Sequence, residues 1–212
     1  MYSRITGTGS YLPPRVVTNA DLEKIVDTTD EWIRTRSGIE RRHHVDPGET
    51  TSTMCTKAAL RAMEMAGVTA ADIDFVVVGT CTPDQVFPNV ATMVQASLGI
   101  ADTPAFSVET ACSGFVYALS IADKYIRLGE AKCALVIGAD ALSKILDLAL
   151  EVRHRWRPLF DGSRHGKPQS GKIIRRGKIG LRGIVVKPGP LIPREEEGAA
   201  SVLHGIAHGR LV

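Results

Sequence analysis

The chain has 212 residues, of which 44% are hydrophobic and 23% are charged, a composition typical of globular proteins and unlike that of disordered chains. No run approaches 18 consecutive apolar residues, so no transmembrane helix or membrane partner is expected. The N-terminus lacks the long apolar stretch of a secretory signal, which predicts a cytoplasmic protein. The four cysteines have no CxxC spacing and are too few for a disulfide framework, so free thiols are expected.

The net charge of +3 combines two unlike parts of the chain. Residues 1–150 carry 13 basic and 18 acidic side chains, a balance of −5, whereas residues 151–212 carry 13 and 5, a balance of +8. A basic end can mean a surface that binds nucleic acid or phosphate. No helix-turn-helix, zinc-finger or RNA-binding motif accompanies this charge, and we therefore expect no nucleic-acid partner.

Strands and helices alternate along the first part of the chain. The predicted strands are apolar or alternating runs at 4–12, 74–80, 105–108 and 134–139. The predicted helices, each opened by a capping residue or ended by glycine, span 18–26, 29–38, 51–66, 90–98 and 113–128. This alternation predicts an α/β fold of βαβ units, with a parallel sheet that is covered by helices on both faces.

The alternating pattern stops near residue 147, which we take as a domain boundary. Residues 151–212 hold ten Gly, five Pro, clustered charges and one short apolar run, Gly183-Ile184-Val185-Val186. We interpret residues 148–212 as an irregular, poorly structured basic tail. His204 and His208 have i,i+4 spacing but no third ligand motif, so no metal site is predicted.

Cys112 follows a predicted strand and precedes the predicted helix 113–128. The backbone N–H groups and the dipole at a helix N-terminus stabilise a thiolate, and they can also receive the oxyanion that forms when a thiolate attacks a thioester. Most cysteines are instead small buried hydrophobic residues. The local sequence alone leaves these two interpretations of Cys112 evenly balanced, whereas it favours the structural interpretation for Cys55, Cys81 and Cys133.

The segment 109–115, Glu-Thr-Ala-Cys-Ser-Gly-Phe, resembles the nucleophile motif of β-ketoacyl-[acyl-carrier-protein] synthase III, a family of the thiolase superfamily. Further similar motifs are Gly7-Thr8-Gly9 with the residues that follow it, the string 30–39 (Asp-Glu-Trp-Ile-Arg-Thr-Arg-Ser-Gly-Ile), 82–84, and 137–147. Several motifs in the same order favour a catalytic Cys112. The resemblance implies a thiolase-like fold for residues 1–147, the N-terminal half of a duplicated fold.

The resemblance also implies a reaction. The cysteine takes an acyl group from acetyl-CoA or another short acyl-CoA, and the acyl-enzyme then condenses with malonyl-acyl-carrier protein in the step that initiates fatty-acid synthesis. This is a ping-pong scheme through a covalent thioester. No cofactor is implied, because the CoA thioester is itself the substrate.

The family pattern implies further site residues and a partner. Trp32 matches the tryptophan that stacks on the adenine of CoA, and Thr28 and Arg36 match contacts to its nucleotide end. Phe87 matches the residue that limits the acyl pocket across the interface of a homodimer. Without the motif, these residues would be interpreted as ordinary packing or solvated side chains.

The resemblance ends near residue 147, and the family's later Phe-Gly-Asp-Gly, His-Gln-Ala-Asn and Gly-Asn-Thr-Ser motifs do not occur in the chain. The last two supply the histidine and asparagine that act in condensation. We therefore expect a truncated form that is impaired in condensation, with a tail that is a frameshifted or misassembled continuation. The alternative is a catalytically dead remnant that binds acyl-CoA or dimerises.

Overall fold

The computed structural model describes residues 2–145 and 181–189. These residues form two compact units. The first, which we call the sheet unit, contains residues 2–12, 47–141 and 181–189, and the second, the hairpin unit, contains residues 13–46 and 142–145.

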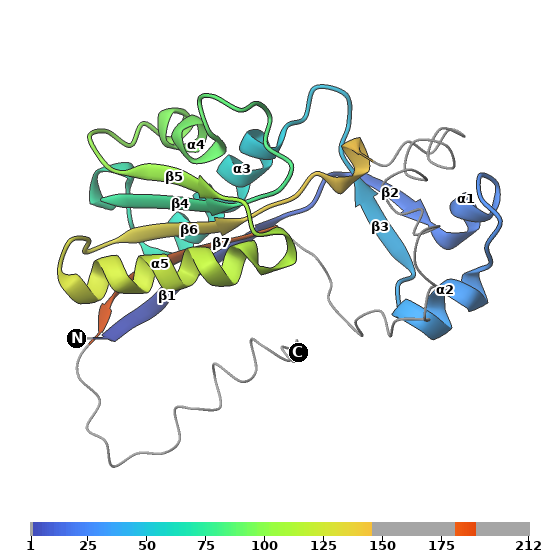
Figure 1. Ribbon diagram of the computed structural model, residues 1–212, viewed down its shortest axis with the longest axis horizontal. Helices are drawn as coiled ribbons and strands as arrows, with labels where there is room; N and C mark the ends of the chain where they lie inside the picture. The colour runs from blue at the N-terminus through green and yellow to red at the C-terminus, as the bar shows by residue number, and fades with distance from the viewer. Residues whose placement is uncertain (1, 146–180, 190–212) are drawn as a thin grey trace, which may run out of the picture. The chain divides into compact units, whose positions relative to one another are not determined.

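The sheet unit is built on one five-stranded sheet in the order β1-β7-β6-β4-β5 (Figure 1). The strands are β1 (Tyr2–Tyr11), β4 (Phe75–Gly79), β5 (Ala105–Val108), β6 (Ala134–Gly138) and β7 (Leu181–Gly189). β4 pairs in parallel with both β5 and β6, whereas β7 runs antiparallel to β6 and to β1. The α/β class is as predicted, but the sheet is mixed rather than all parallel.

Helices cover both faces of this sheet, as the strand–helix alternation predicts. α3 (Thr51–Ala66) and α4 (Val90–Leu98) lie on one side, and α5 (Gly114–Leu128) lies on the other (Figure 1). Every side chain of β4 is fully buried, which agrees with the prediction from its β-branched run. The face toward α5 contributes a core of buried apolar residues that includes Phe75, Val77, Ala118, Val136 and Ile184.

The glycines of the Gly7-Thr8-Gly9 motif let α3 pack closely on β1. A Cβ atom at position 7 would collide with the carbonyl oxygen of Ala62, and one at position 9 would collide with that of Ala58. Both alanines are fully buried. The motif therefore has a packing role in which the strand and the helix approach backbone to backbone.

Strand β7 was not expected, because it lies inside the region that we interpreted as a poorly structured tail. Its residues Ile184, Val185 and Val186 are at most 4% exposed. Val185 pairs with Gly7 of β1 on one side and with Leu135 of β6 on the other, so that β7 fills an interior position of the sheet. A four-residue apolar run is too short to identify a strand by periodicity. Here the segment becomes a strand because its backbone pairs with the hydrogen-bonding groups of β1 on one side and of β6 on the other. Residues 148–180 and 190–212, including His204 and His208, lie outside the described residues.

The hairpin unit contains two strands and two short helices. β2 (Arg15–Thr18) pairs antiparallel with β3 (Arg41–His44), and α1 (Asn19–Glu23) and α2 (Asp30–Ser37) lie between them in sequence. Thr18 and Thr29 accept hydrogen bonds from backbone N–H groups at the starts of the two helices, as their positions predict. The pairing of β2 with β3 was not predicted, because neither four-residue segment has an alternating apolar pattern.

Asn19 is the buried hub of the hairpin unit. Its Nδ2 donates to Asp30 Oδ1 at 2.7 Å and to the carbonyl of Ile39 at 2.8 Å, and its Oδ1 accepts from the guanidinium of Arg42 at 2.8 Å. The side chain thus joins α1, α2, the segment after α2, and β3. These three bonds satisfy a polar group that is only 1% exposed.

Three short 3₁₀ turns complete the described elements: η1 (Ala70–Asp72), η2 (Ala111–Ser113) and η3 (Leu142–Lys144). Within residues 2–145 and 181–189, no helix is both long and apolar enough to cross a membrane.

Candidate active site at the end of strand β5

Cys112 lies in η2, between the end of β5 and the first residue of α5, and its side chain is exposed. Ser113, which precedes α5, makes no side-chain capping hydrogen bond. The first turn of a helix presents backbone N–H groups and the positive end of the helix dipole. A negatively charged atom beside Cys112 would therefore be in a favourable position, as the sequence predicts.

The backbone just before Cys112 is strained. Ala111 has φ +45°, a conformation that residues with a Cβ atom rarely adopt. Such strain costs on the order of 1–3 kcal/mol and persists only where the surrounding structure imposes it. The surrounding structure therefore imposes the conformation of Ala111, the residue that precedes Cys112.

A close backbone contact fixes this turn over the sheet. A Cβ atom on Gly79, at the end of β4, would collide with the carbonyl group of Gly114, and one on Gly114 would lie only 3.3 Å from the backbone of Gly79. The start of α5 therefore rests directly on the carboxyl end of β4. This contact places the Cys112 turn at the edge where three parallel strands end, the edge at which open α/β sheets bind ligands.

Asp140 organises the same edge from the end of β6. Its Oδ1 accepts hydrogen bonds from the backbone N–H of Cys81 at 2.8 Å, the Thr80 hydroxyl at 3.3 Å and the Thr82 hydroxyl at 3.4 Å. The Thr82 hydroxyl in turn accepts from the backbone N–H of Ala141 at 2.7 Å. The carboxylate thus joins the segments that follow β4 and β6. Asp140 lies within the motif at 137–147, and its sequence context alone predicts no chemical role for it.

The other three cysteines have raised pKa values, so none of them rests as a thiolate. Burial raises the pKa of the Cys55 thiol and raises the pKa of the Cys133 thiol to about 11. Cys81 is exposed, but partial burial and the hydrogen bond to Asp140 raise its pKa to about 11. All three are therefore protonated at neutral pH, and only the thiolate is the reactive form.

The predicted CoA-binding residues lie in the hairpin unit. Trp32 on α2 is 54% exposed, and the guanidinium carbon of Arg36 lies 4.3 Å from the centre of its ring, one helical turn away. Thr28, just before α2, is partly exposed. The structure thus brings Trp32 and Arg36 together as an exposed aromatic and cationic pair.

Phe87 lies in the loop between β4 and α4 and is 87% exposed, beside Val86 at 95%. Exposure of two adjacent large apolar side chains is unusual for residues whose role is core packing. Phe87 is therefore not a core residue of the described chain, which excludes the ordinary packing role for it.

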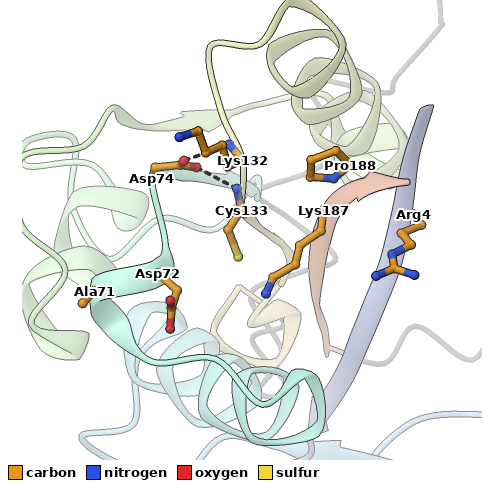
Figure 2. Close-up of a pocket in the computed structure, with 8 residues that line it drawn as sticks. All are labelled: Arg4, Ala71, Asp72, Asp74, Lys132, Cys133, Lys187 and Pro188. Carbon is orange, nitrogen blue, oxygen red and sulfur yellow. Dashed lines mark hydrogen bonds between the residues drawn. The ribbon is translucent and has the colours of Figure 1, made fainter. Parts of the chain in front are cut away.

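A hollow of about 490 Å³ lies at the opposite edge of the sheet (Figure 2). Its lining combines basic and acidic side chains, including Arg4, Lys132, Lys187, Asp72 and Asp74, with Cys133 and Pro188. Asp74 accepts hydrogen bonds from the backbone N–H groups of Lys132 and Cys133 at 2.8 and 2.9 Å. The hollow is distant in the fold from Cys112, since it lies where the parallel strands begin. In the described part of the chain, no group of three or more His, Cys, Asp or Glu side chains is placed to hold a metal ion.

The sheet order and the cysteine at the strand-to-helix turn agree with known folds. The structure of 3-oxoacyl-[acyl-carrier-protein] synthase III from Aquifex aeolicus superposes with a TM-score of 0.72 at 39% identity and covers 89% of this chain and 55% of its own. The priming β-ketosynthase of the R1128 polyketide pathway superposes with a TM-score of 0.73 at 33% identity and covers 90% and 51%. The described fold is therefore a thiolase-like α/β fold.

Comparisons of the sequence indicate which family with this fold the chain resembles. Residues 106–160 match the family model of 3-oxoacyl-[acyl-carrier-protein] synthase III. The β-ketoacyl-[acyl-carrier-protein] synthase III of Xanthomonas campestris is 59% identical over 147 residues, and that of Thioalkalivibrio sulfidiphilus is 57% identical over 146. Over this part, the chain is related to the β-ketoacyl-[acyl-carrier-protein] synthase III family, as its motifs predict.

The sequence match covers only part of this chain and only part of each relative. It covers 69% of this chain, and the chain spans about 45% of the length of the curated relatives that it matches. The match to the family model ends at residue 160, beyond the break that we predicted near residue 147. The structural superpositions extend further along the chain, since they cover 89% and 90% of it.

Proposed function

We propose that this chain is an acyltransferase in which Cys112 takes an acyl group from acetyl-CoA or another short acyl-CoA. The observation that supports this most directly is the exposed Cys112 in the strained turn between β5 and α5, within the family's nucleophile motif. In the reaction the Cys112 sulfur attacks the thioester carbonyl, a carbon–sulfur bond forms, and the bond to the CoA sulfur breaks. Backbone N–H groups at the start of α5 would receive the oxyanion.

In the proposed enzyme, the nucleotide of CoA binds to Thr28, Trp32 and Arg36. An exposed indole offers a flat face to an adenine, and a guanidinium matches the geometry of phosphate. The pairing of Arg36 with Trp32 supports this role, since it presents both groups on one side of α2. No cofactor is needed, because the thioester itself supplies the activated acyl group.

The second half-reaction, condensation with malonyl-acyl-carrier protein to start fatty-acid synthesis, is proposed in an impaired form. The histidine and asparagine motifs that the family uses to stabilise the decarboxylated intermediate do not occur in the sequence. We further propose a cytoplasmic homodimer in which Phe87 reaches the acyl pocket of the partner. The exposure of Val86 and Phe87 supports an interface at this loop.

The test is the intact mass of the full chain after incubation with acetyl-CoA. We expect one acetyl group, attached at Cys112 in the peptide map and lost in Cys112→Ala, whereas the control Cys133→Ser acquires it normally. Trp32→Ala should need more acetyl-CoA for the same extent of labelling, yet should react normally with a small acetyl thioester that lacks the nucleotide.

Absence of the adduct on a folded chain would contradict the enzyme proposal. If that chain still bound CoA through Trp32, the result would favour the alternative, a catalytically dead acyl-CoA-binding remnant. Sedimentation of the full chain and of Phe87→Glu would test the homodimer separately.

A further inference from the structure

Two exposed thiols follow neighbouring strands at the edge that holds the candidate active site. Cys81 comes two residues after the end of β4, and Cys112 comes four residues after the end of β5. The ends of these strands are paired, with Gly79 opposite Val108, and the pairing continues in a hydrogen bond from the Thr80 N–H to the Val108 carbonyl at 3.1 Å.

The close contact of Gly79 with Gly114 then brings the two cysteines together. Each cysteine lies two residues from one of these glycines, and a Cβ atom on Gly114 would lie 3.7 Å from the backbone nitrogen of Thr80, the neighbour of Cys81. In agreement with this geometry, burial and Asp140 are the main causes that raise the pKa of the Cys81 thiol, and an electrostatic interaction with Cys112 adds to them. The thiols are therefore close enough to interact electrostatically.

Asp140 supplies a base for one member of this pair. The Cys81 S–H donates to Asp140 Oδ1 at 3.2 Å, while the backbone N–H of Cys81 donates to the same oxygen at 2.8 Å. The carboxylate thus fixes the position of Cys81 and lies where it can accept the proton of its thiol. The two remaining cysteines, Cys55 and Cys133, are 0% and 3% exposed and have no comparable access to solvent.

We propose that Cys112 and Cys81 form a peroxide-sensitive thiol pair, in which Cys112 is oxidised first and Cys81 traps it as an intramolecular disulfide. In the first step the Cys112 thiolate attacks hydrogen peroxide, a sulfur–oxygen bond forms, the oxygen–oxygen bond breaks, and the displaced oxygen leaves as water after protonation. The product is a sulfenic acid at Cys112.

In the second step the Cys81 sulfur attacks the Cys112 sulfur. The disulfide bond forms and the sulfur–oxygen bond breaks. Asp140 accepts the proton of Cys81 and passes it to the departing hydroxyl group, which leaves as water. The overall change oxidises two thiols to one disulfide and reduces one peroxide to two molecules of water. The disulfide protects Cys112 from irreversible oxidation and withdraws its sulfur from acyl transfer until a thiol reductant restores it.

The experiment treats the reduced full chain with hydrogen peroxide, blocks remaining thiols with N-ethylmaleimide, and maps the peptides by mass spectrometry. We expect a cross-link between the Cys81 and Cys112 peptides within one chain, removed by dithiothreitol. The matched variant is Cys81→Ser, because serine retains a donor for Asp140. In this variant the cross-link should be lost, and Cys112 should instead be labelled by dimedone and proceed to the sulfinic acid.

Asp140→Asn tests the proposed base, since the amide cannot accept the thiol proton. We expect slower formation of the disulfide and a longer-lived dimedone-reactive Cys112. The proposal is overturned if the natural chain and Cys81→Ser give equal dimedone labelling with no cross-link between positions 81 and 112, or if the cross-link joins two chains. These readouts need no acyl-CoA, so they are independent of the proposed acyl transfer.

Discussion

Replacing Ile184 by Ala tests whether β7 is an integral strand of the sheet unit. The Ile184 side chain is 4% exposed and belongs to the core between the sheet and α5. The change removes three buried carbons, which at about 0.8 kcal/mol each corresponds to about 2.4 kcal/mol of lost transfer free energy. The cavity that remains adds to this loss, so we expect the free energy of unfolding to fall by about 2–5 kcal/mol.

The matched control is Leu128→Ala, which removes the same number of carbons from a side chain that is 75% exposed. This change should alter the free energy of unfolding by less than about 0.5 kcal/mol. Urea unfolding followed by far-UV circular dichroism measures both variants. Hydrogen exchange of the β1 and β6 amides shows whether the loss falls on the strands that β7 joins, as the pairing requires.

A loss for Ile184→Ala no larger than that for Leu128→Ala would refute the reasoning. Residues 181–189 would then contribute no buried strand in solution, and the interpretation of the whole C-terminal part as an irregular tail would stand. A large loss that left exchange at β1 and β6 unchanged would also contradict the strand order, since β7 is the strand that connects them.

Three further predictions concern local features. Ala111→Gly should leave the free energy of unfolding unchanged or raise it by up to about 1 kcal/mol, because relief of positive-φ strain outweighs the conformational entropy that glycine loses on folding. Ala111→Val should lower the free energy of unfolding by more than about 1 kcal/mol, because a β-branched side chain fits a positive φ poorly. Urea unfolding midpoints that rank the two variants in the opposite order would contradict this prediction. Asn19→Ala should destabilise the hairpin unit by about 1.5–4.5 kcal/mol, the sum of three hydrogen bonds, as measured by hydrogen exchange of its amides, and a loss below about 0.5 kcal/mol would exclude Asn19 as its hub. His44 is buried and its pKa is lowered, mainly by burial and also by Arg15 and Arg42, so it binds a proton more weakly in the folded than in the unfolded chain. The stability of the hairpin unit should therefore be complete above pH 6.5 and fall below it, by at most about 1.4 kcal/mol per pH unit, and His44→Gln should lose this dependence in unfolding experiments between pH 5 and about 7.

Local sequence determined most elements of the sheet unit. The predicted helices at 51–66 and 90–98 coincide with α3 and α4, and the strand at 105–108 coincides with β5. These segments have their own caps, their own period and an apolar face, so that local preference and tertiary packing agree. The position of Cys112 before a helix was predictable for the same reason, and its role as a nucleophile remains a proposal.

Tertiary structure alone decided the remaining features. The run at 183–186 became β7 because β1 and β6 offered unpaired backbone groups on both sides, information that no short segment contains. Three other features also join residues that are far apart in sequence: the pairing of β2 with β3, the hydrogen bonds of Asn19, and those between Cys81 and Asp140. Periodicity and capping describe neighbours within a few residues along the chain, whereas these contacts arise only when distant segments fold against each other.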